Sequence, residues 1–75
     1  MDKEKIDRLD EIGEEFDCPL LMPPFNGSLN PFYCIKDIKH DAIKFRNFFV
    51  QLDEVDIDFR YVEIDGKKDY MEIFS

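Results

Sequence analysis

Only a few side chains in this 75-residue chain could act as nucleophiles, general bases or metal ligands. They are one histidine, His40, and two cysteines, Cys18 and Cys34. No glycine-rich phosphate loop or nucleophile elbow accompanies them, and no CxxC pair gives the spacing of a structural zinc site. A chain this short also rarely encloses a catalytic cleft. We therefore expect a non-enzymatic protein with no cofactor and no metal site.

The carboxylates of Glu54, Asp56 and Asp58 offer a different kind of chemistry. On a strand, alternate residues point to the same side about 6.6 Å apart, which spreads them too widely to converge on one Ca²⁺ or Mg²⁺. Successive phosphates of a nucleic acid strand lie a similar distance apart, roughly 6 to 7 Å, so such a row could imitate a phosphate backbone. The predicted partner-binding surface comprises these three acids, the acids of the N-terminal helix, and Asp53, Glu63, Asp65 and Asp69.

The overall charge restricts the class of partner. Eighteen acidic and ten basic residues give a net charge of −8. Such a charge repels nucleic acid phosphates and anionic membranes, so we expect neither as a direct ligand. By segment, residues 1–17 carry −5, residues 18–35 carry none, residues 36–50 carry +2 and residues 51–75 carry −5. This distribution favours a larger basic protein, of the kind that binds nucleic acid, as the partner.

Two helices are expected to form much of the core. The first spans residues 2–16, where four apolar residues share one narrow face: Ile6, Leu9, Ile12 and Phe16. Gly13 lies on that face, where it either lets another backbone approach closely or marks a frayed helix end. The second helix is expected from Asp37, its predicted N-cap, to Leu52. Its broad apolar face contains Ala42, Phe45, Phe48, Phe49 and Leu52.

A β-hairpin is expected to follow the second helix. From Val55, apolar and polar residues alternate, which is typical of a half-buried strand. Asp65 and Gly66 suit a tight turn, and residues 67–74 form the returning strand. A two-residue loop would place Tyr61 opposite Tyr70, whereas a three-residue loop with a bulge would move Tyr70 to the other face. The sequence leaves both registers open.

The uncharged segment 18–35 contains all four prolines, which excludes a long helix. Two short extended pieces, 18–22 and 32–35, remain possible around an Asn26-Gly27 turn. The segment either covers the core or forms an apolar docking surface from Leu20, Leu21, Met22, Phe25 and Phe32. In the second case the protein would be an assembly module that associates through this segment and the hairpin edge, and a homodimer is one such arrangement.

These features together predict a single small acidic domain over residues 1–75. Its fold class is α+β, with two helices packed on one face of a small antiparallel β-sheet that ends in a C-terminal β-hairpin. The first residues are charged and resemble no secretory leader, so we expect a cytoplasmic protein with free cysteine thiols. Alanine occurs once, whereas Ile, Phe, Lys, Asp and Asn are frequent, which is typical of AT-rich genomes.

The leading functional hypothesis combines charge, size and composition. Small acidic proteins from AT-rich genes are typical of phages and other mobile elements that inactivate nucleic-acid enzymes of a bacterial host. We therefore expect an inhibitor that binds a basic nucleic-acid-binding host protein by mimicking the phosphate backbone of DNA.

Overall fold

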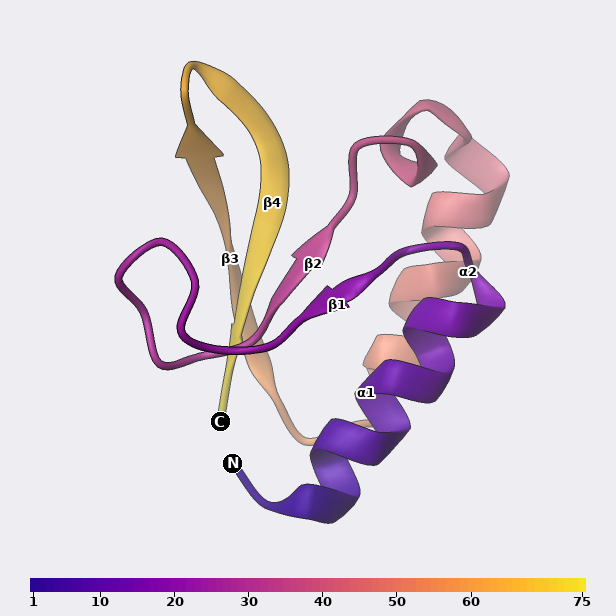
Figure 1. Cartoon of the computed structure of the whole chain (residues 1–75). Helices are drawn as coiled ribbons and strands as arrows, with labels where there is room; N and C mark the ends of the chain where they lie inside the picture. The colour runs from indigo at the N-terminus through magenta and orange to yellow at the C-terminus, as the bar shows by residue number, and fades with distance from the viewer.

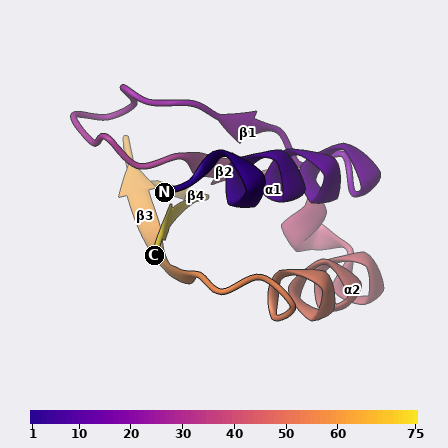
Figure 2. The ribbon, with the colours of Figure 1, turned by 90° about the horizontal axis from the view of Figure 1, so that it is seen from below.

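The computed structural model describes all 75 residues and confirms the α+β class. Two α-helices lie on the same side of a four-stranded antiparallel sheet of order β1-β2-β4-β3 (Figure 1; Figure 2, from below). The elements are α1 (Lys3–Glu15), β1 (Leu20–Leu21), β2 (Phe32–Cys34), η1 (Ile38–His40), α2 (Ala42–Leu52), β3 (Asp58–Ile64) and β4 (Lys67–Phe74).

Local signals define both ends of α1. The side chain of Asp2 accepts a hydrogen bond from the Lys5 amide at 2.9 Å, as an N-cap residue should. At the other end Asp17 has a φ of 55°, and the Cys18 amide donates to the Gly13 carbonyl at 2.8 Å. This is the Schellman arrangement, in which a left-handed residue reverses the chain.

Of the two interpretations of Gly13, the structure supports the first, in which the glycine lets another backbone segment approach closely. A Cβ atom there would lie 2.5 Å from the Cys18 carbonyl oxygen and 3.2 Å from Cε1 of Tyr33. Since real Cβ atoms do not approach other atoms this closely, any larger residue would force the chain after α1 to move. Glycine at this position therefore lets the Schellman turn pack directly on α1.

The second helix begins later than the sequence indicated. Asp37 makes no capping hydrogen bond, and residues 38–40 form only one 3₁₀ turn. Asp41 interrupts the helix with an extended backbone, and its carboxylate accepts from the Lys44 amide at 3.0 Å. Asp37 as the N-cap was therefore wrong, because Asp41 satisfies a free amide of the first turn of α2 and fixes the start of that helix there.

The hairpin has the expected turn but a shifted register. Asp65 and Gly66 have φ angles of 53° and 77°, as a two-residue type I′ turn requires, and Ile64 pairs with Lys67. A bulge then shifts the pairing, so Tyr61 lies opposite Met71 and not opposite Tyr70. Of the two registers left open, Tyr61 opposite Tyr70 is therefore excluded, and a bulge moves Tyr70 to the other face, although it accompanies a two-residue loop and not a three-residue one.

The strand expected from Val55 begins at Asp58. Asp58 pairs with Phe74, the last residue of β4, so residues 55–57 have no strand opposite them. Their backbone groups turn locally instead, with the Val55 amide donating to the Leu52 carbonyl at 2.9 Å. The alternating pattern thus extends beyond the residues that can pair.

The core lies between the helices and one face of the sheet. Phe48 is fully buried, and its ring makes edge-to-face contacts with Tyr33 and Phe16 at centroid distances of 5.0 and 5.8 Å. The Tyr33 hydroxyl donates to the Leu9 carbonyl, which ties β2 to α1. Other buried members of this cluster are Ile12, Cys18, Ile35, Ile38, Leu52, Met71 and Ile73.

Both cysteines are free thiols. Cys18 is buried in the core, and its thiol donates to the Cys34 carbonyl oxygen at 3.2 Å. Burial, followed by the proximity of Cys34, raises the pKa of the Cys18 thiol to about 12. Because the thiolate is the reactive form, Cys18 is unreactive at neutral pH.

Candidate protein-binding surface

The seven acids outside the N-terminal helix that were predicted to bind a partner occupy three different places. Asp53 ends α2, Glu54 and Asp56 lie in the connection that follows, and Asp58 begins β3. All four are exposed and close together in sequence. Only Asp58 is on a strand, however, so the even row of carboxylates expected for Glu54, Asp56 and Asp58 is not formed.

The other three acids are separated from this group. Glu63 and Asp65 are exposed near the hairpin turn, roughly 20 Å along β3 at about 3.3 Å per residue. Asp69 is only 7% exposed, and Lys39 Nζ lies 2.6 Å from its carboxylate. The hydrogen bond from Lys39 lowers the pKa of Asp69, so this carboxylate is charged and already neutralised within the protein.

Contacts between the helices add a second group of acids beside segment 53–58. Lys5 Nζ donates to the Asp56 carbonyl at 2.7 Å and lies 3.7 Å from its carboxylate. Arg8 Nη2 donates to the Gln51 side chain at 2.9 Å. The start of α1 therefore lies beside the end of α2, and the flank of α1 that carries Lys5 and Arg8 faces segment 53–58.

The outer side of α1 consists of exposed carboxylates. Leu9 and Ile12 are completely buried on its inner side, which fixes the orientation of the helix. On the opposite side, five exposed acids recur at three-, four- and seven-residue intervals: Glu4, Asp7, Glu11, Glu14 and Glu15. We refer to these five acids, together with Asp53, Glu54, Asp56 and Asp58, as the acidic face.

Charge is concentrated in the two segments that carry this face. Residues 2–17 and 53–58 contain twelve acids and three bases, a charge of −9. The rest of the chain contains six acids and seven bases, a charge of +1. The whole excess negative charge of the protein therefore belongs to the helix α1 region and the end of α2.

Few internal cations neutralise the acidic face. Its ion pairs are long contacts of 3.7 Å, from Lys5 to Asp56 and from Arg8 to Glu11. The other members have no ion-pair partner: Glu4, Asp7, Glu14, Glu15, Asp53, Glu54 and Asp58. Mutual repulsion among these carboxylates would be relieved by a cationic surface placed against them.

The apolar segment 18–35 covers the face of the sheet that the helices leave open. Phe32 is 1% exposed, and the ring of Phe25 packs on Phe32 and Tyr70 at centroid distances of 4.9 and 5.3 Å. Leu21 is half-buried and Met22 is half-exposed. Of the five residues proposed for apolar docking, Phe25, Phe32 and Leu20 therefore form internal contacts of the protein itself, with Leu20 packed against the core.

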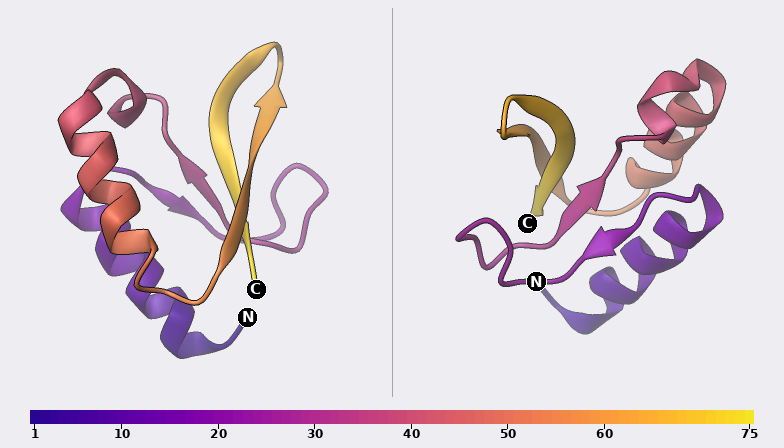
Figure 3. Two further views of the ribbon diagram at one scale, coloured as in Figure 1. Left: turned by 180° about the vertical axis from the view of Figure 1, so that it is seen from behind. Right: turned by 45° about the horizontal axis from the view of Figure 1, so that its top comes forward.

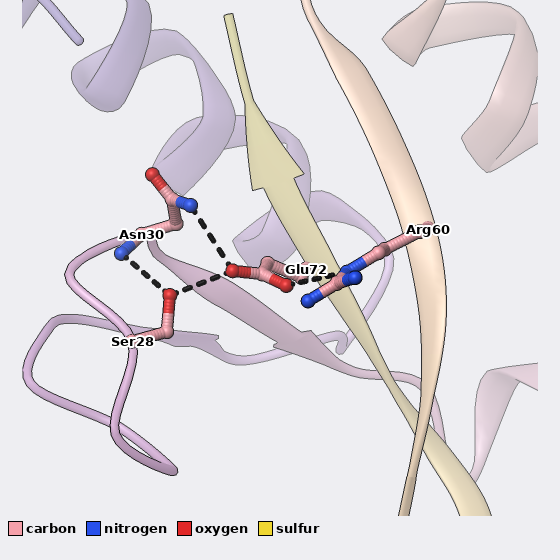
Figure 4. Close-up of polar contacts among 4 residues, drawn as sticks. All are labelled: Ser28, Asn30, Arg60 and Glu72. Carbon is pink, nitrogen blue, oxygen red and sulfur yellow. Dashed lines mark hydrogen bonds and ion pairs between the residues drawn. The ribbon is translucent and has the colours of Figure 1, made fainter.

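A buried carboxylate that the sequence analysis did not single out holds this segment in place (Figure 4). Glu72 on β4 is 4% exposed and accepts hydrogen bonds from Ser28 Oγ at 2.6 Å, Asn30 Nδ2 at 3.0 Å and Arg60 Nε at 2.7 Å. The bonds from Ser28 and Asn30, then Arg60, lower the pKa of Glu72 to about 2 despite its burial. Both carboxylate oxygens are occupied, so Glu72 anchors the segment to the sheet.

The structure brings together no group of three His, Cys, Asp or Glu side chains placed to hold a metal ion. His40 is exposed at the end of η1, away from the buried Cys18. Neither helix has the length and apolar composition needed to cross a bilayer. Comparison of the chain with family models, curated proteins and solved structures found no match.

Proposed function

We propose that this protein is a non-enzymatic inhibitor that binds a larger basic protein and occupies the site where that protein binds nucleic acid. The observation that carries the proposal is the charge asymmetry, −9 in the segments of the acidic face against +1 elsewhere. A merely solubilising charge would need no such concentration, because mixed charges spread over the whole surface serve that purpose.

The spacing of the carboxylates on α1 supports phosphate mimicry. Acids three or four residues apart on a helix have Cβ atoms about 5–6 Å apart, close to the roughly 6–7 Å between successive phosphates of one strand. From Glu4 to Glu15 the row extends about 16 Å along the helix axis. In this proposal the helix takes the role that the sequence analysis gave to the strand.

The rigidity of the acidic face favours tight binding. The buried side chains of Leu9 and Ile12 and the Schellman turn at Gly13 hold α1 against the core. A preorganised row of charges loses little conformational freedom on binding, and its field accelerates the approach of a basic partner. We propose a nucleic-acid-binding protein of a bacterial host cytoplasm as this partner, in keeping with the AT-rich composition.

Charge reversal with a matched control tests the proposal. Asp7→Lys with Glu14→Lys reverses two exposed, unpaired acids of the face, whereas Asp37→Lys with Glu63→Lys makes the same charge change outside it. Wild-type and variant proteins are used to capture partners from a lysate of a bacterium with an AT-rich genome, and each partner is eluted in steps of rising salt and identified by mass spectrometry.

We expect the wild type and the control variant to retain the same basic nucleic-acid-binding protein and the Asp7/Glu14 variant to lose it. The affinity of the purified pair should fall by about a hundredfold in that variant and by less than about threefold in the control. Equal loss in both variants, or retention in both, would contradict the proposal.

A further inference from the structure

Strand β3 is a long, uncovered edge of the sheet. The order β1-β2-β4-β3 leaves β3 with a neighbour on one side only, and β3 has seven residues. Natural proteins usually shorten, cover or interrupt such edges, because free backbone groups can pair with another strand. Nothing in this chain pairs with the outer side of β3.

The hydrogen-bond pattern shows which backbone groups are free. On β4, the Ile73 amide donates to the Pro31 carbonyl and the Asp69 carbonyl accepts from Ile35, so the odd-numbered residues of β4 point away from β3. The even-numbered residues therefore bond to β3, where they lie opposite Asp58, Arg60 and Val62. The intervening Phe59 and Tyr61 direct their amide and carbonyl groups to the free edge. Glu63 does the same, because it lies between the paired residues Val62 and Ile64 and has no partner on β4.

Aromatic side chains lie along this edge without full cover. Phe59 and Tyr61 are 39% and 53% exposed on the helix-facing side of the sheet. Their rings continue a row that begins on α2, with centroid distances of 4.7 Å from Phe45 to Phe49, 5.4 Å from Phe49 to Phe59 and 6.0 Å from Phe59 to Tyr61. Exposed aromatic rows of this kind are typical of interfaces.

The row borders a cleft of about 540 Å³. Its lining residues are Ile35, Lys39, Phe45, Tyr61, Glu63 and Lys68. The hairpin tip leans away from α2 in both views of Figure 3, and the cleft lies between these two elements. An added strand at the edge of β3 would therefore find an open surface beside it, with apolar contacts from Ile35, Phe45 and Tyr61.

We propose that a second copy of this chain occupies this edge, with the two β3 strands antiparallel about a twofold axis at Tyr61, so that two four-stranded sheets become one. Tyr61 then lies opposite Tyr61 of the second copy, and Phe59 lies opposite Glu63 of the second copy. Each of these pairs joins residues whose backbone groups face the free edge, so both can exchange two hydrogen bonds. The proposal shares Asp58 with the acidic face but does not rest on that face as an inhibitory surface, because it is tested on the purified protein alone.

The distribution of charge along β3 argues for a second copy in the antiparallel direction. Asp56 and Asp58 precede or begin the strand, whereas Lys67 follows the turn at its far end. Asp58 would lie opposite Ile64 of the second copy, and Ile64 pairs with Lys67 on the same sheet face. Lys67 of the second copy thus lies two strands from Asp58, about 10 Å away on the same sheet face, and the symmetry forms this attraction twice. Parallel pairing would bring the two acidic starts together.

Sedimentation velocity at physiological salt tests the dimer, over protein concentrations from about 1 to 500 µM. We expect a concentration-dependent dimer in the wild type. Tyr61→Pro removes an amide that faces the free edge, a position where a strand tolerates proline, and should leave a folded monomer. Tyr61→Lys provides the same test without the backbone change, and Leu29→Lys, at a residue 84% exposed elsewhere, is the matched control that should still dimerise.

A charge exchange tests the direction of pairing. Asp58→Lys and Lys67→Glu should each weaken the dimer by about threefold to tenfold, because each places like charges together twice. An equimolar mixture of the two variants should recover wild-type affinity. In the mixed dimer the new lysine at position 58 faces the new glutamate at position 67, and the other pair is the native Asp58 and Lys67. A wild type that stays monomeric throughout, or a dimer insensitive to both Tyr61 variants or not recovered by mixing, would overturn the proposal.

Discussion

Replacing Gly13 with alanine separates helix propensity from tertiary packing, because the two predict opposite signs. Alanine in a helix interior is normally more stable than glycine by about 1 kcal/mol. Here the new Cβ would lie 2.5 Å from the Cys18 carbonyl oxygen and 3.2 Å from the ring of Tyr33. Neither atom can retreat easily, since Cys18 closes the Schellman turn and Tyr33 bonds to the Leu9 carbonyl.

The magnitude follows from these contacts. Overpacking of a well-packed site costs roughly 1–3 kcal/mol, and weakening the 2.8 Å bond from the Cys18 amide to the Gly13 carbonyl costs about 1 kcal/mol more. After subtracting the gain in propensity, we expect Gly13→Ala to lower the free energy of unfolding by about 1–3 kcal/mol. For a domain of this size that corresponds to a fall in Tm of roughly 5–20 °C.

Urea denaturation followed by far-UV circular dichroism measures this change. Asp7→Ala is the matched control, because it also introduces alanine into α1 but at an exposed, unpaired position. The control should be as stable as the wild type or slightly more stable. A Gly13→Ala protein equal to or above the wild type in stability would refute the close approach of the turn, and with it the argument that this turn fixes the acidic face.

Three further predictions concern residues that position the elements. Asp41→Ala should lower the free energy of unfolding by about 1 kcal/mol, because it removes the N-cap of α2. Asp37→Ala should change it by less than about 0.5 kcal/mol, and thermal unfolding of both variants compares them directly. Asp17→Gly should raise stability relative to Asp17→Ala by about 0.5–1 kcal/mol in the same assay, since glycine adopts a φ of 55° without strain and both variants lose the exposed 3.1 Å ion pair with Lys44. A glycine variant no more stable than the alanine variant would contradict the Schellman assignment. The pKa of Glu72 is about 2 in the folded protein and 4.5 ordinarily, so the stability it contributes is complete above pH 4.5 and is lost as the pH falls toward 2. Urea denaturation at several pH values should show that the free energy of unfolding falls more steeply over this pH range in the wild type than in Glu72→Gln. An equally steep fall in both proteins would argue against the hydrogen-bonded carboxylate.

Local signals in the sequence were sufficient for most of the fold. The α1 stripe, the Phe-rich face of α2 and the Asp65-Gly66 turn each depend on neighbouring residues, and all three are present in the structure. The start of α2 was misplaced because Asp37 and Asp41 both suit an N-cap. Only the extended backbone at Asp41 decides between them.

The remaining differences come from contacts between distant segments. The beginning of β3 is set by the end of β4 at Phe74, and the register is set by a bulge, neither of which is visible in the alternation of side chains. The role of Glu72 was also not visible in the sequence, because its partners Ser28 and Asn30 are more than forty residues away.

The acidic face depends on such contacts as well. Its two parts, α1 and segment 53–58, meet only through contacts such as that of Lys5 with Asp56. The sequence did show the repeat of acids along α1. That repeat indicates an exposed helix side, but only the packing of the two helices places it beside the acids that follow α2.

Displacement by DNA tests the central claim most directly. The partner captured on immobilised wild-type protein is challenged with duplex DNA at constant ionic strength, and the released protein is measured. If the acidic face occupies a nucleic-acid-binding site, DNA should release the partner in proportion to its concentration, because the two ligands cannot bind together. A partner that remains bound at saturating DNA, or that binds DNA and this protein at once, would contradict the account.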